Sequence, residues 1–263
     1  MLRNVFTKTL WEQRIGIVGW CLGLAVAAAV YAAFYPSIRS PEMAAALENY
    51  PQAMIEAFGL SDMISPAGYL QSTVFGIIGP ILILIFAIST GTRAIAGDEH
   101  AGTLDLLLAY PVSRTKVLLH RFAALAVALS LIGVSVLLML IALNNPAELA
   151  LPVSHLAAMA LQLSLLGLSF GALALAAGAI TGRPTLALGI ASGFGVVSYF
   201  ANTLAPRVDG LAWLQKLSPF YYYSGSEPLR NGLQAGDTAV LLGLVIVFVV
   251  IGVVGFNRRD IGV

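Results

Sequence analysis

The ionisable residues of this 263-residue chain that lie close enough to act together are concentrated in one stretch, GDEHAGTLDLLLAYPVSRTK at 97–116. It is the only dense cluster of charge between long apolar segments. Its ionisable side chains are Asp98, Glu99, His100, Asp105, Arg114 and Lys116. An apolar segment leads into this stretch and another leaves it, so we interpret it as a charged loop on which another molecule pushes.

The local pattern predicts how this loop folds. Asp98 and Glu99 favour the positive end of a helix dipole, so a short helix should begin there and cover 98–109. One face of that helix is apolar, because three leucines recur at helical spacing: Leu104, Leu107 and Leu108. Pro111 ends the helix, and Ser113 is a good N-cap for the next one.

The elements on either side must cross a membrane. The chain is 59% hydrophobic and 10% charged, with a mean hydropathy of +0.88, whereas soluble proteins carry about 25% charged residues. The single cysteine, Cys21, excludes a disulfide framework and a cysteine metal cluster. These values indicate an integral membrane protein.

Six uncharged segments are long enough to span a bilayer, which takes about 20 residues. They lie at 15–34, 73–92, 122–143, 156–180, 185–204 and 239–256. Residues 1–14 alternate basic and apolar side chains around Trp11, which suits a helix in the membrane interface. The sequence therefore predicts an all-α polytopic membrane protein, 1–263, as a single transmembrane domain with an N-terminal interfacial helix.

The distribution of Lys and Arg predicts the orientation of these spans. With six spans, both termini lie on one side, together with 10 of the 14 Lys and Arg residues. The other four are Arg39, Arg207, Lys216 and Arg230. Because basic loops stay in the cytoplasm, we expect a multi-pass protein of the cytoplasmic membrane with both termini inside.

Several kinds of chemistry are missing from the sequence. The span interiors contain no Asp, Glu, Lys, Arg or His, which argues against a carrier driven by an ion gradient and against an intramembrane hydrolase. None of the three lysines, Lys8, Lys116 and Lys216, follows a glycine, so the chain has no phosphate-binding loop. We expect no enzymatic activity and no bound cofactor; if ATP drives this protein, a separate chain hydrolyses it.

Three motifs resemble those of ABC-2 type transporter permeases, from about residue 70 to the end of the chain. The most specific combines Glu99, Gly102-Thr103-Leu104, Leu107-Leu108 and Pro111-Val112-Ser113-Arg114. Two weaker ones are Leu217-Ser218-Pro219-Phe220-Tyr221 and the final Phe256-Asn257-Arg258-Arg259-Asp260-Ile261.

The resemblance implies the membrane subunit of an ABC transporter, an exporter, docked to a cytosolic ATPase that holds ATP and Mg. The helix at 98–109 would be the coupling helix between the second and third spans, with Glu99 paired to a basic residue of the ATPase. The residues implied in coupling are Asp98, Glu99, Gly102, Thr103, Leu104, Leu107 and Arg114. The resemblance also implies a second permease copy or a paralogue as a partner, together with membrane lipid. No nucleic acid is expected as a partner. A non-transporting anchor or assembly factor on the same scaffold is the alternative.

In relatives the second and fifth spans line the substrate path. Here the polar residues of these spans and their ends are Gln71, Ser72, Ser89, Ser192, Ser198 and Asn202; interhelical hydrogen bonding is the other reading. Glycines four residues apart suit close helix packing, first within the chain and second at a dimer seam. These pairs are Gly19 and Gly23, Gly167 and Gly171, Gly178 and Gly182, and Gly189 and Gly193.

Overall fold

The computed structural model describes residues 4–38, 62–104, 112–208 and 210–259, and all regular structure within them is helical. Six helices there are long and apolar enough to cross a membrane. Their bounds are Val5–Ile38, Pro66–His100, Arg114–Leu143, Val153–Thr181, Pro184–Arg207 and Ala235–Arg258. Each contains one predicted span, so the predicted all-α polytopic class is confirmed.

The second of these helices is built from five pieces without a break. It begins as α4 (Pro66–Ser72), widens into the π-helical turn η2 (Val74–Ile78) and continues as α5 (Gly79–Thr92). A second π-helical turn, η3 (Arg93–Gly97), leads into α6 (Asp98–His100). Wide turns of this kind are rare and occur often at functional sites. Here both flank α5.

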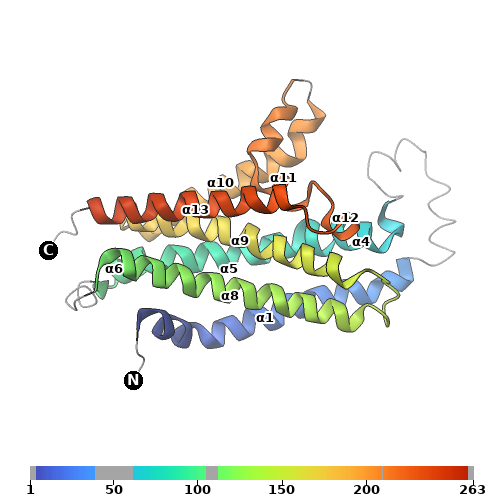
Figure 1. Ribbon diagram of the computed structural model, residues 1–263, viewed down its shortest axis with the longest axis horizontal. Coiled ribbons are helices and arrows are strands. Elements are labelled where there is room, and N and C mark those ends of the chain that lie inside the picture. The colour runs from blue at the N-terminus through green and yellow to red at the C-terminus, as the bar shows by residue number, and fades with distance from the viewer. Residues whose placement is uncertain (1–3, 39–61, 105–111, 209, 260–263) are drawn as a thin grey trace.

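The helix α9 (Val153–Thr181) lies at the centre of the bundle (Figure 1). It packs against α5, α8 (Arg114–Leu143), α10 (Pro184–Leu204) and α13 (Ala235–Arg258). Most of its residues are buried, including Gly167 and Gly171. A side chain at either glycine would meet atoms of neighbouring helices. This pair therefore packs within the chain, as predicted.

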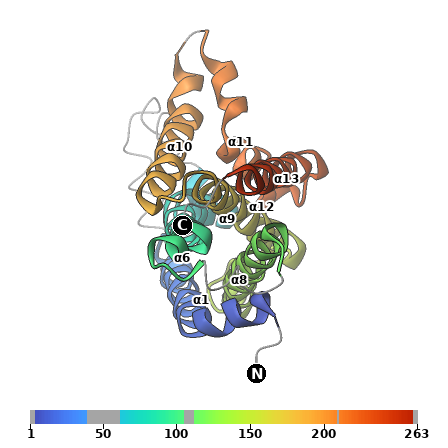
Figure 2. The same cartoon turned by 90° about the vertical axis from the view of Figure 1, so that its left-hand side faces the viewer.

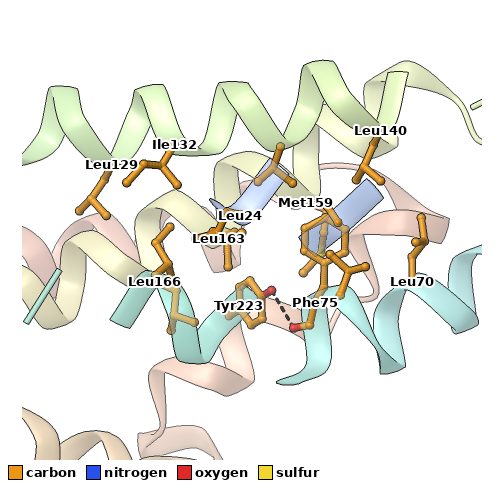
Figure 3. Close-up of a cluster of buried hydrophobic side chains, with 14 of the residues drawn as sticks. Leu24, Leu70, Phe75, Leu129, Ile132, Leu140, Met159, Leu163, Leu166 and Tyr223 are labelled. Carbon is orange, nitrogen blue, oxygen red and sulfur yellow. Dashed lines mark hydrogen bonds between the residues drawn. The ribbon is translucent and has the colours of Figure 1, made fainter. Parts of the chain in front are cut away.

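The core joins several of the spans to a short helix from the segment between α10 and α13 (Figure 3). Leu129 and Ile132 of α8 lie beside Leu163 of α9. From α11 (Pro219–Ser224), the buried Tyr223 hydroxyl donates a hydrogen bond of 2.8 Å to the Phe75 carbonyl. Because Phe75 belongs to η2, this bond anchors the π-helical turn within the core.

The N-terminal part of α1 (Val5–Ile38) runs across the bundle axis before the helix turns along it (Figure 2). Trp11 on this part is 56% exposed, and the Arg14 guanidinium stacks 4.1 Å from the centroid of its ring. The residues predicted to form a separate interfacial helix are therefore the first part of α1.

Unlike the other spans, α10 leans away from the bundle and returns through η5 (Ala212–Leu217) to α11 (Figures 1 and 2). Only four of its residues are buried: Ala187, Ala191, Gly195 and Ser198. Gly189 and Gly193 have nothing within 4 Å of where a side chain would begin. Among the described residues, nothing therefore packs against these two glycines.

The glycine contacts predict a difference between two matched substitutions. In Gly91→Ala, the new methyl group would overlap the carbonyl oxygen of Gly171, a backbone atom that cannot move aside. In Gly19→Ala, the methyl group meets nothing within 4 Å. We expect Gly91→Ala to destabilise the bundle by about 1–3 kcal/mol, the usual result of overpacking, whereas Gly19→Ala should be neutral or stabilising. Thermal unfolding in detergent measures both, and equal midpoints would contradict this packing.

Candidate functional site

The charged loop begins as the end of the second span. Gly97 has helical backbone angles (φ −65°, ψ −44°), and Asp98 and Glu99 continue the helix that started at Pro66. The prediction that a helix begins at Asp98 is therefore wrong. The attraction of a carboxylate to a helix N-terminus is worth less than about 1 kcal/mol at an exposed site, which does not outweigh the continuing backbone hydrogen bonds of an existing helix.

A glycine turn ends this helix after His100, so the prediction of one continuous helix over 98–109 is also wrong. Gly102 has φ 67°, in the left-handed region. Its N–H donates to the Glu99 carbonyl at 3.0 Å, and the N–H of Thr103 donates to the Asp98 carbonyl at 2.9 Å. This pair of bonds is the Schellman motif, in which glycine is favoured because it lacks a side chain. Gly102 and Thr103 thus fix the direction in which the chain leaves the helix.

Leu104 follows this turn and is 1% exposed, packed with Ile95, Val117 and Phe256. This apolar contact holds the loop against the ends of α8 and α13. The rest of the predicted helix, including Asp105, Leu107 and Leu108, lies outside the described residues.

The two carboxylates at the end of the second span bind different parts of the bundle. Asp98 pairs with Arg121 of α8. Lys8 and Glu12, an ion pair on the first part of α1, also act electrostatically on Asp98. The Asp98–Arg121 ion pair connects α6 with α8.

Glu99 pairs instead with Arg259, which directly follows α13. The same guanidinium donates to the Ala179 carbonyl at 3.0 Å, near the end of α9. The side chains of Glu99 and Arg259 are 25% and 18% exposed, and this partial burial lowers the pKa of the Arg259 guanidinium. Glu99 was expected to seek a basic residue on a partner; the structure gives it one in its own chain.

Arg114 fixes the end of α13 from the opposite side. Its guanidinium donates to the carbonyls of Arg259 at 2.6 Å and Phe256 at 3.2 Å, and lies 5.8 Å from the centroid of the Phe256 ring. A cation at these carbonyls suits the negative end of a helix. Ser113 accepts a bond from the Lys116 N–H at 3.3 Å, which confirms it as the N-cap of α8.

Six of the seven residues proposed for coupling therefore meet at one end of the bundle, the end that Figure 2 faces: Asp98, Glu99, Gly102, Thr103, Leu104 and Arg114. Sequence reasoning did not assign Arg121 and Arg259 to this site. Arg259 was visible only as part of the final motif, 160 residues from Glu99. Among the described residues there is no group of histidine, cysteine and acidic side chains able to hold a metal ion.

A groove of about 460 Å³ lies between the second and fifth spans. Its wall is apolar except for Ser89 of α5, Ser192 of α10 and the Tyr199 side chain. Apolar lining residues include Ile81, Ile85, Leu188 and Val196, with Phe220 of α11. The structure thus brings two of the six candidate path residues, Ser89 and Ser192, to one groove.

The other four candidates do not line this groove: Gln71, Ser72, Ser198 and Asn202. Ser198 is buried, and its carbonyl accepts a bond of 2.8 Å from the Ser218 hydroxyl. That contact links α10 to the start of α11, so for Ser198 the structure shows a role in packing.

Comparison with known proteins gives one finding. A family model described as "ABC-2 family transporter protein" matches residues 3–261. No curated protein matches the chain.

The turn at Gly102 yields a test of this end of the structure. Alanine at 102 must adopt a left-handed conformation that costs roughly 1–2 kcal/mol for an L-residue. Proline is worse, because its φ is locked near −65° and it has no N–H to donate to Glu99. We expect faster hydrogen exchange at the Thr103 amide in Gly102→Ala, and still faster exchange in Gly102→Pro. Ala101→Ser, at an exposed position with φ −81°, should leave it unchanged. Equal exchange in all variants would contradict the turn.

Proposed function

The chain belongs to the ABC-2 family of transporter proteins, and we propose that it is the permease subunit of an ABC exporter whose ATP is hydrolysed by a separate cytosolic ATPase. The match over residues 3–261 confirms the resemblance found in the motifs. A protein of this family is the membrane component of a transporter and is not itself catalytic.

One observation carries the proposal: the groove wall and the charged turn belong to a single helix. Pro66–His100 is continuous from α4 through α5, which lines the groove, to α6, which ends at the Gly102 turn. A displacement applied to the turn is therefore applied directly to the wall. An anchor or assembly factor needs no such connection.

The docking surface for the ATPase is the exposed tip of this turn. His100, Ala101, Gly102 and Thr103 are exposed, whereas Asp98 and Glu99 are engaged with Arg121 and Arg259. In this proposal the acidic pair holds the tip in place, and the tip contacts the ATPase.

The groove between α5 and α10 is the proposed substrate path. Its wall of isoleucine, leucine and valine, with the hydroxyl groups of Ser89 and Ser192, suits a hydrophobic or amphipathic substrate with few polar groups. The lightly packed α10, with Gly189 and Gly193 open, is the surface on which a second permease copy or a paralogue would close the path.

The docking proposal predicts that bulk at the tip prevents assembly. In Ala101→Trp, a large side chain is added at an exposed position of the tip, where it would collide with a docked ATPase. A clash of about 1.4 kcal/mol lowers the association constant about tenfold. We therefore expect Ala101→Trp to insert normally but to retain far less of a co-expressed ABC ATPase on purification.

Gln234→Trp is the matched control, because Gln234 is also exposed but lies at the opposite end of the bundle, just before α13. It should retain the ATPase. Equal retention in the two variants would show that the tip does not dock the ATPase. Co-purification of no ABC ATPase with the unsubstituted chain would overturn the proposed function.

The orientation follows from the same assignment. The Gly102 turn and the basic residues around it should face the cytoplasm, in the cytoplasmic membrane. In a Cys21→Ala background, we expect Ala101→Cys to react with a membrane-impermeant maleimide only from the cytoplasmic face. Gln234→Cys should react only from the opposite face. Labelling of both positions from the same face would refute the six-span topology.

A further inference from the structure

We infer that Arg259 is a positioning residue that latches the second span to the start of the fifth, closing the groove at the end where the ATPase would dock. This inference rests on the proposed function in taking the groove as the substrate path. The two ion pairs at this end of the bundle, Asp98–Arg121 and Glu99–Arg259, hold the loop in place and do not line the groove.

The first observation is that one guanidinium bridges two spans. Arg259 pairs with Glu99 at the end of the second span and donates at 3.0 Å to the Ala179 carbonyl near the end of the fourth. Its own carbonyl accepts a bond of 2.6 Å from Arg114 of α8. Arg259 is thus held at its backbone while its side chain joins two other elements.

The second observation places this pair against the turn that starts the fifth span. Gly182 ends α9 with φ 65°, and its N–H donates to the Gly178 carbonyl at 2.9 Å. A side chain at Gly182 would overlap both the Arg259 guanidinium and the Glu99 carboxylate. The helix α10 begins two residues later, at Pro184. The ion pair therefore lies directly on the connection between α9 and α10.

The third observation is the distance from this contact to the groove. Leu188 lines the groove six residues after Gly182 and four residues after α10 begins at Pro184, which is about 6 Å of helix. Ser89 lines it ten residues before Glu99, about 15 Å along the second span. The Glu99–Arg259 pair thus lies beyond this end of the groove, beside the turn that leads into α10.

The neighbouring ion pair is connected differently and shows what is specific to Arg259. Arg121 lies on α8, and neither α8 nor α1 contributes a residue to the groove lining. Arg121 pairs with Asp98 and Arg259 pairs with the next residue, Glu99. The two arginine side chains are similarly buried, 13% exposed for Arg121 and 18% for Arg259. Loss of either removes a comparable ion pair, but only the loss of Arg259 separates the groove walls.

The consequence is a latch that movement of α6 would open. While Glu99 holds Arg259 against the Gly182 turn, α6 and the first turn of α10 stay together. When an ATPase displaces the tip, Glu99 moves with it and the two walls separate at their inner ends. Removing the pair should therefore open the groove without nucleotide.

The test measures access to the groove from the face that bears the Gly102 turn. Leu188→Cys in a Cys21→Ala background is labelled with a membrane-impermeant maleimide in membrane vesicles of that orientation, without any ATPase. We expect Arg259→Ala to raise the labelling rate several-fold over the parent chain, and the matched Arg121→Ala to leave it at the parent value.

A second variant separates the latch from general loosening. Arg259→Ala also frees the Ala179 carbonyl, whereas Glu99→Gln removes only the charge and keeps the shape of the side chain. Glu99→Gln should raise the rate in the same way, and the double variant should raise it no further, because the two residues act as one unit.

Three outcomes would overturn the inference: equal labelling in Arg259→Ala, Glu99→Gln and the parent, an equal rise in Arg121→Ala, or additive effects in the double variant. The experiment contains no ATPase, so it does not depend on the docking test above. A failure of ATPase binding would refute the proposed function and leave the labelling result standing.

Discussion

Close packing around α9 is the constraint on which the rest of this structure depends. In a bilayer, apolar side chains gain little by leaving lipid for protein, so helices associate where their backbones approach closely. Gly167 and Gly171 allow this approach on α9, and Gly91 allows it on α5. The fourth span is therefore buried along most of its length. Its neighbours are placed by their contact with it.

The two candidate functional regions lie where this packing stops. At the end of the bundle that bears the Gly102 turn, charged side chains replace small ones as the links between helices: Asp98 with Arg121, Glu99 with Arg259, and Arg114 with the Arg259 carbonyl after α13. Beside α5, the departure of α10 leaves an apolar groove. The central helix α9 thus packs closely with its neighbours, while the groove between α5 and α10 stays open beside it.

The sequence alone is sufficient to predict where the spans lie, but it is insufficient to predict the contacts between them. Uncharged runs of about 20 residues locate the six helices because the bilayer imposes their length, and the Ser113 N-cap follows from local hydrogen bonding. The continuation of the second span through Asp98 does not follow from local hydrogen bonding, because it depends on a helix already formed upstream. Glu99 and Arg259 are partners only because α6 and α13 end at the same face of the bundle. Similarly, polarity alone does not distinguish Ser192, which lines the groove, from Ser198, which packs toward Ser218.

The π-helical turns on either side of α5 carry a consequence for how such a groove diversifies during evolution. Each turn, Val74–Ile78 and Arg93–Gly97, accommodates one residue more than an α-helical turn. Deleting a residue from either would restore ordinary helix and rotate α5 by roughly 100° relative to the segment beyond it. A different row of side chains would then face α10. In this helix, the deletion of one residue is enough to turn different side chains of α5 toward the groove, without any amino-acid substitution.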